Sequence, residues 1–218
     1  EPIRQSSLGN ELRFDHNTEN DNEDFQGYEL YYKIYNANND EQINDDRGSL
    51  EATERPGTTV LNRLDFYKMV RTETGSPDGR GWNLDEQDPP ILPVNSDERD
   101  SRFTVSVSFS SAPEYRTVVA INPGANETVP LYRQNVRLNE QASDTVFDRF
   151  LEVEEYDYSG TSLDASNDAD LADMLREPFD DTATYRAAVV VIAFGIDATN
   201  FQRIYSTPVY LGTVDLDL

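Results

Sequence analysis

Alternation of apolar and polar residues is the dominant pattern along this chain of 218 residues. Gly27–Tyr35 alternates with the period of a β-strand, in which successive side chains point to opposite faces. One face of this segment carries Tyr28, Leu30, Tyr32 and Ile34, and the other carries Glu29, Tyr31, Lys33 and Tyr35. Arg102–Ser110 alternates in the same way. Arg186–Phe194 is apolar at nearly every position, which is typical of a central strand covered on both faces.

Further segments of this kind predict a β protein. They are Leu12–His16, Thr59–Arg71, Tyr115–Ile121, Val129–Leu138, Phe147–Tyr156, Thr184–Gly195 and Ile204–Val214. Acidic, Asn-rich loops are expected at Asn17–Asp24, Asn36–Asp46 and Gly75–Asp100. One short surface helix is expected at Asp168–Arg176, which begins after an Asn or Ser cap and ends before Pro178. We therefore predict an all-β antiparallel β-sandwich forming a single domain over residues 1–218.

Charge narrows the classes of partner. Asp and Glu total 42 against 18 Lys and Arg, a net charge of −24. Because phosphate binding needs Lys and Arg patches and the chain has no basic cluster, nucleic-acid binding is excluded. No apolar run reaches the roughly 18 residues that a transmembrane helix requires. The absence of cysteine excludes disulfides and thiol chemistry.

Two explanations fit the acidity. The acidic surface could bind cations, or it could keep the protein soluble in a saline habitat where salt screens its self-repulsion. Only Lys33 and Lys68 are lysines, and all other basic residues except the single histidine are arginines. Scarce lysine and abundant Asp resemble the composition of halophilic proteins, so we favour the saline explanation.

Both ends of the chain resemble fibronectin type III domains. Leu12–Tyr35 is similar to strands B and C of that family, with Phe14 where the family usually has Trp. Tyr185–Leu211, with Ser206–Pro208 in its second half, is similar to strands F and G. The resemblance implies an immunoglobulin-like sandwich in which residues 36–150 form a long elaborating insertion.

The pattern F-x-G-Y-E-(apolar)-Y-Y-K-I-Y also resembles envelope lipoproteins of spirochaete-type bacteria. That resemblance implies a lipid-anchored or secreted surface protein and no catalytic residues. Because the chain begins at Glu1 without methionine, we expect an export signal to have been removed. The predicted location is therefore the bacterial cell envelope or the extracellular space.

Candidate chemistry is sparse. The single histidine, His16, lacks a nucleophile elbow elsewhere in the chain, so a Ser/His/Asp triad is not expected. Asp164, Ser166, Asp168 and Asp170 have the alternate-position oxygens of a calcium loop. The glycine and the closing glutamate of an EF-hand are absent there, and helix capping explains the same residues. Calcium is thus an alternative, and no other cofactor is predicted.

Tyr31 and Tyr35 share one strand face and are candidates for an aromatic platform that binds a sugar or a partner. The alternative, which we favour, is that the insertion covers this face and makes the two rings part of a second core layer. We predict a non-catalytic structural or interaction module with protein partners or self-assembly on a cell surface. A carbohydrate- or calcium-binding module is the alternative function.

Overall fold

The computed structural model describes residues 1–7, 11–20, 24–71, 92–94, 100, 102–109, 117–121, 128–132 and 184–216. Antiparallel sheets dominate this part of the chain and helices are few, so the predicted all-β class is confirmed. The strand expected at Phe147–Tyr156, the helix expected at Asp168–Arg176 and the proposed calcium loop lie outside the described residues.

The first sheet has six strands in the order β1-β2-β7-β8-β9-β5, and every neighbouring pair is antiparallel. Their bounds are Ile3–Arg4 (β1), Glu11–Asp15 (β2), Val70–Arg71 (β5), Thr104–Phe109 (β7), Thr117–Ile121 (β8) and Thr128–Tyr132 (β9). A 3-10 turn, Thr18–Asn20 (η1), follows β2. The strands predicted at Leu12–His16, Arg102–Ser110 and Tyr115–Ile121 therefore each match an observed strand within a few residues. The start of Val129–Leu138 matches β9, and residues 133–138 lie outside the described part of the chain.

The second sheet is built around two long strands, β3 (Phe25–Asn36) and β10 (Tyr185–Ile196), paired from Tyr185↔Asn36 to Gly195↔Phe25. β10 also pairs with β11 (Arg203–Tyr205) and β12 (Val209–Leu216), while β3 also pairs with β4 (Tyr67–Lys68) and β6 (Leu92–Pro93). Two strands thus stand where Ile204–Val214 predicted one. Residues 206–208, which end at a proline without an N–H group, separate them.

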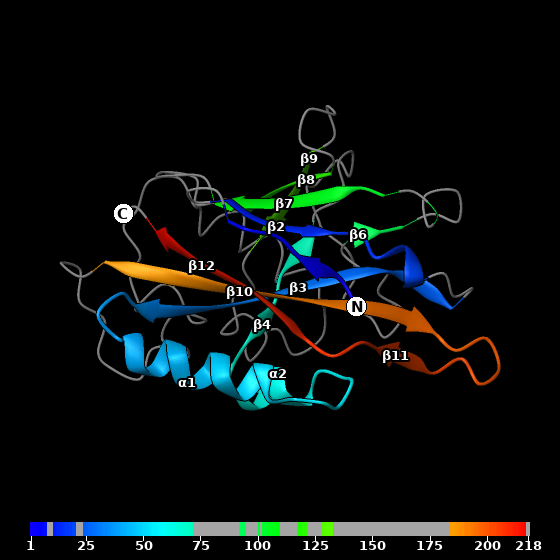
Figure 1. Ribbon diagram of the computed structural model, residues 1–218, viewed down its shortest axis with the longest axis horizontal. Helices are drawn as coiled ribbons and strands as arrows, with labels where there is room; N and C mark the ends of the chain where they lie inside the picture. The colour runs from blue at the N-terminus through cyan, green and yellow to red at the C-terminus, as the bar shows by residue number, and fades with distance from the viewer. Residues whose placement is uncertain are drawn as a thin grey trace, which may run out of the picture.

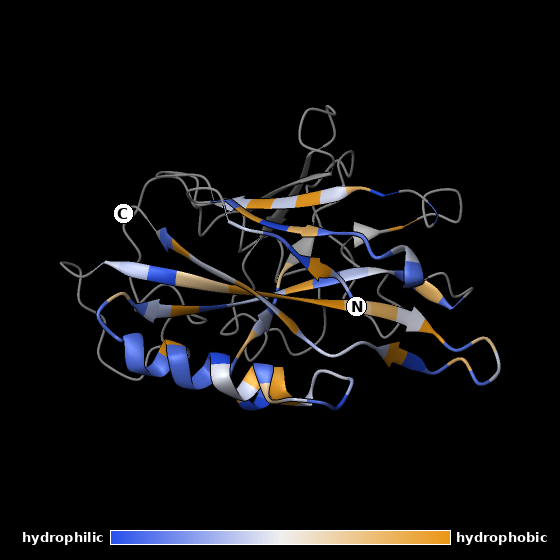
Figure 2. Ribbon diagram, viewed as in Figure 1, coloured by the Kyte–Doolittle hydropathy of each residue, from blue (hydrophilic) through white to orange (hydrophobic). Residues whose placement is uncertain are grey.

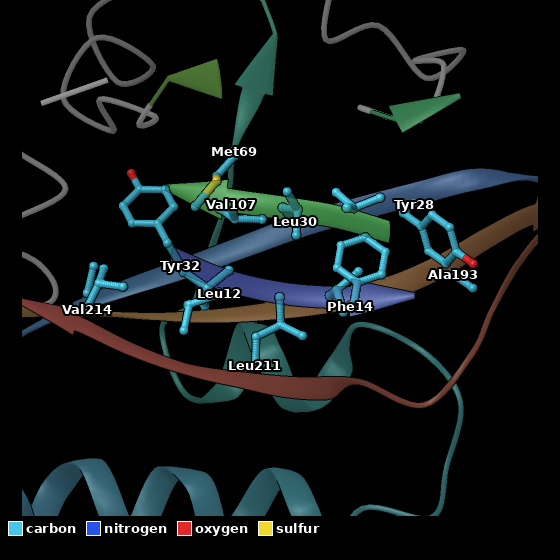
Figure 3. Packing of buried hydrophobic residues seen from close by; sticks show 14 of the residues in the cluster. Leu12, Phe14, Tyr28, Leu30, Tyr32, Met69, Val107, Ala193, Leu211 and Val214 are labelled. Carbon is cyan, nitrogen blue, oxygen red and sulfur yellow. The ribbon is translucent and has the colours of Figure 1, made fainter. Parts of the chain in front are cut away.

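A single hydrophobic cluster lies between the two sheets (Figure 3). Leu12, Phe14, Val105 and Val107 enter it from the first sheet, and Tyr28, Leu30, Tyr32 and Ile34 enter it from β3. Met69 is buried here where the chain passes from β4 in one sheet to β5 in the other. Period-2 alternation therefore predicted the inward face of β3 correctly.

Two helices cover the opposite face of the second sheet (Figure 1). They are α1 (Asp40–Glu51) and α2 (Thr59–Arg63). The prediction of an acidic loop at Asn36–Asp46 and of a strand throughout Thr59–Arg71 is therefore wrong. The side chain of Asn39 caps α1 by accepting a hydrogen bond from the Gln42 amide at 3.2 Å, a role in which Asn is favoured.

Burial follows this layered arrangement. β10 is apolar along most of its length (Figure 2), and Ala187–Phe194 is buried at every position. Its residues contact the intersheet cluster on one face and a second cluster beneath the helices on the other. The sequence-based prediction of a central strand covered on both faces is confirmed. Ile43 and Leu50, seven residues apart, face this second cluster from α1.

Candidate functional site

The two tyrosines predicted to form a platform lie beneath the helices. Tyr31 is 6% exposed and Tyr35 is 1% exposed, and both belong to the cluster that packs against α1 and α2. The Tyr31 hydroxyl donates to Oε2 of Glu29 at 2.8 Å, and the Tyr35 hydroxyl donates to Oδ2 of Asp46 at 2.9 Å. The two rings therefore form a second core layer and present no open aromatic platform.

His16 is also a packing residue. Its ring is stacked on Phe103 with a centroid distance of 4.6 Å and an interplanar angle of 3°, and its Nδ1 lies 2.7 Å from the hydroxyl oxygen of Tyr28. A hollow of about 490 Å³ adjoins this end of β2, but the imidazole itself is buried.

The predicted calcium ligands, Asp164, Ser166, Asp168 and Asp170, lie outside the described residues. Within the described ranges, no group of three or more His, Asp or Glu side chains is arranged to hold a metal ion.

A second hollow, of about 390 Å³, opens on the helix-side face of the second sheet. Its floor comes from β3 and β11 through Glu29, Tyr31, Arg203 and Tyr205. Its wall comes from α2 and the segment that follows it, through Thr58, Asn62, Asp65, Phe66, Tyr67 and Lys68. Segments more than a hundred residues apart in sequence thus meet at one site, which we call the β3–β11 hollow.

A buried carboxylate organises this hollow. Glu29 is 1% exposed, and its Oε1 accepts a hydrogen bond from Lys68 Nζ at 2.8 Å while its Oε2 binds the Tyr31 hydroxyl. Burial and the negative charge of Glu29 raise the pKa of Tyr31 far above its ordinary value. Burial, and next the charge of Glu29, also raise the pKa of Tyr205, against the opposing effect of Arg203. Both hydroxyls therefore remain protonated at neutral pH.

An exposed aromatic residue lies at the tip of the adjoining hairpin between β10 and β11. Phe201 is 82% exposed, the largest value among the exposed large hydrophobic residues of the described chain. Its φ of 58° lies in the left-handed region, which is unusual for a bulky side chain. Ile196 and Ile204 flank it at 38% exposure each. Three of the four exposed large hydrophobic residues in the described ranges thus belong to one hairpin.

The hairpin loop is held by its own hydrogen bonds. Asp197 Oδ1 accepts from the Thr199 amide at 2.7 Å and Oδ2 accepts from Asn200 Nδ2 at 3.0 Å. The Phe201 amide donates to the Asp197 carbonyl at 2.8 Å. Hydrogen bonds from Thr199, and secondarily from Asn200, lower the pKa of Asp197, so its carboxylate stays ionised. A loop built this way presents Phe201 in a defined position.

Sequence reasoning predicted the strands on both sides of the hairpin but missed the exposed Phe201 and the hollow. Phe201 stands in a polar loop, where a single aromatic residue carries no periodic signal. The signal for the hollow was present in the charged positions of β3, because Glu29 alternates with tyrosines on the face that the helices cover. The chain's two lysines are the second signal: Lys33 and Lys68 both form ion pairs with buried acids on that face.

In comparisons with known proteins, no protein-family model, curated protein or solved structure matches this chain. In the part of the chain that the structure describes, no helix is long and apolar enough to cross a membrane.

Proposed function

We propose that this chain is a non-catalytic interaction module that binds a protein partner through the β10–β11 hairpin. The observation that carries this proposal is the exposure of Phe201 on a loop ordered by hydrogen bonds. Aromatic side chains dominate the energetics of protein interfaces, and a preformed loop loses little conformational entropy on binding. The exposed Phe201 side chain would therefore supply the main apolar contact with a protein partner.

Charge defines the partner. At low ionic strength, two copies of a chain with a net charge of −24 repel each other, which disfavours self-association. The ionised carboxylate of Asp197 lies in the same loop as Phe201, and the Asp24 carboxylate accepts a hydrogen bond from the Ala198 amide at 2.9 Å. The matching partner surface is an apolar pocket rimmed by Arg or Lys.

The fold we propose for this module is a fibronectin III-like β-sandwich. In immunoglobulin-type domains, strands A, B and E belong to one sheet and strands C, F and G to the other. The neighbours β1-β2-β7 and β3-β10-β12 reproduce these two groups in order. The two sheets also share one hydrophobic cluster, which supports the proposal. α1 and α2 follow the C-like strand β3 and belong to the proposed elaboration over residues 36–150.

The setting we propose is a bacterial cell envelope or surface assembly in saline surroundings. The acidic composition supports the saline surroundings, and so does the position of the lysines. Lys33 and Lys68 form ion pairs whose acidic partners are buried, so the chain retains lysine where it packs and uses arginine elsewhere.

A photo-crosslinking amino acid placed at position 201 in intact source cells tests the interaction. Position 3 is the matched control, because Ile3 is another exposed hydrophobic residue at 48% but lies on β1. We expect an adduct with one protein from position 201 only. The purified partner should then bind the Phe201→Ser variant at least about tenfold more weakly than wild type, and the Ile3→Ser variant as well as wild type. Equal binding by both variants, or no adduct at position 201, would contradict the proposal.

A further inference from the structure

The β3–β11 hollow has the shape and size of a small-molecule site. Its volume of about 390 Å³ falls within the range of roughly 300–1,000 Å³ found for ligand pockets. It opens at the surface while its floor is the rigid second sheet, in which β3 and β10 pair along their length. A ligand could therefore enter the hollow from the surface and contact side chains whose positions are fixed by the sheet.

The charges around the hollow balance. Among the lining residues that the structure describes, Glu29 and Asp65 are acidic, and Lys68 and Arg203 are basic. Glu29 and Lys68 form an ion pair with a distance of 2.8 Å. The protein has a net charge of −24, but the lining of this hollow has no net charge. The hollow therefore suits an uncharged ligand better than an anion or a cation.

The remaining lining residues include both aromatic side chains and side chains that form hydrogen bonds. Tyr205 is half-buried and lines the hollow, whereas the side chain of Tyr67 packs against the intersheet cluster. Thr58 and Asn62 add a hydroxyl and an amide from the α2 side. Tyr205 packs beside its cross-strand neighbour Phe194 with a centroid distance of 5.4 Å, a contact that helps to hold its ring in place. A tyrosine side chain has an apolar ring and a polar hydroxyl, so it can contact a ligand that has both apolar and polar surfaces.

We propose that the β3–β11 hollow binds a neutral saccharide. The C–H face of a sugar ring would pack on Tyr205, while its hydroxyl groups would exchange hydrogen bonds with Asn62 and Asp65. This site is separate from the tip of the hairpin and stands whether or not Phe201 binds a protein.

Calorimetric titration of the purified chain tests the proposal. The probes are neutral cello-, xylo-, manno- and chito-oligosaccharides, with oligogalacturonate as the anionic probe, all in buffer of high NaCl concentration. We expect binding of at least one neutral probe and none of oligogalacturonate. Tyr205→Ala should weaken the affinity by about tenfold or more, because it removes the stacking surface, and Asn62→Ala by about two- to tenfold.

Asn44→Ala is the matched control. Asn44 and Asn62 are both exposed asparagines on the helices that cover the second sheet, but only Asn62 lines the hollow. Asn44→Ala and Phe201→Ser should bind the saccharide as well as wild type. Tyr205→Phe guards against misfolding, since it keeps the ring and should retain most of the affinity. Absence of binding to every neutral probe would overturn the proposal, and so would preference for oligogalacturonate or full affinity in both Tyr205→Ala and Asn62→Ala.

Discussion

Lys33 and Asp46 form a buried ion pair that joins the second sheet to helix α1. Lys33 Nζ lies 2.8 Å from Asp46 Oδ2, and the two side chains are 1% and 5% exposed. Lys33 Nζ also donates to the carbonyl of Leu64, the C-cap residue directly after α2, at 2.6 Å. One ammonium group thus connects β3 to both helices, and the Tyr35 hydroxyl adds a further bond to Asp46.

Breaking this pair on one side should cost stability. Lys33→Met leaves the Asp46 carboxylate buried without its counter-charge, so we expect the free energy of unfolding to fall by about 3–5 kcal/mol. Chemical denaturation measures this change. In the double variant Lys33→Met/Asp46→Leu both charges are absent, and its stability should exceed that of either single variant.

The exposed pair Arg47–Glu51 on the same helix is the control. Its atoms are 2.7 Å apart, but the side chains are 44% and 50% exposed. Glu51→Ala should leave the unfolding free energy nearly unchanged, because exposed i,i+4 pairs contribute little. A loss at Lys33→Met no larger than at Glu51→Ala would show that the buried network does not hold the helices.

Two glycines should respond to alanine in opposite directions. A Cβ on Gly195 would lie 2.6 Å from the carbonyl oxygen of Asp24, a backbone atom that also accepts the Ile196 amide at 2.8 Å. Gly195→Ala should therefore lower the melting temperature. Gly48 lies inside α1 with open space around it, so Gly48→Ala should raise the unfolding free energy by roughly 0.5–1 kcal/mol through helix propensity. The same direction of change in both variants would contradict this geometry.

Tyr31 makes stability depend on alkaline pH. Its pKa in the folded state is raised, first by burial and then by Glu29, whereas its pKa in the unfolded chain stays near the ordinary value of about 10. The folded state therefore keeps a proton that the unfolded state releases, and stability is complete below about pH 10 and decreases above it.

Denaturation of wild type and Tyr31→Phe across this pH range isolates the effect. The variant should lose some stability at neutral pH, since the bond to Glu29 is gone, but its stability should fall less steeply above about pH 10. Identical slopes for the two proteins would mean that other groups control the alkaline transition.

Salt and calcium distinguish the two explanations of the acidity. Raising NaCl from about 0.1 M to 1 M shortens the screening length from about 10 Å to 3 Å and weakens the self-repulsion of a chain with charge −24. We expect the melting temperature to rise by several degrees. Millimolar calcium at matched ionic strength, compared with EDTA, should add nothing. A calcium-specific rise would instead assign a metal site to the acidic segments, with Asp164–Asp170 the first candidate.

Local sequence was sufficient for the two long strands and insufficient for the helices. Alternation at Gly27–Tyr35 and the apolar run at Arg186–Phe194 located β3 and β10 because a strand's two faces differ in burial. The acidic, Asn-rich composition of Asn36–Asp46 indicated a loop, but most of this segment lies in the helix Asp40–Glu51. The helix α1 forms because Asn39 caps it and because a few of its residues, Ile43 and Leu50 among them, pack on an apolar surface of β3 and β10. That surface exists only after the two strands have paired.

The candidate site depends in the same way on contacts that form only after the strands have paired, and these contacts cannot be predicted from the sequence. By itself the sequence determined the all-β class, the acidic exterior and the scarcity of lysine, since all three depend on composition or on neighbouring residues. Only the tertiary structure decided that Glu29 meets Lys68 inside a hollow and that Asp46 meets Lys33 beneath the helices. Buried charges need partners, and those partners are brought within bonding distance by the packing of sheet and helix, which neither periodicity nor charge count describes.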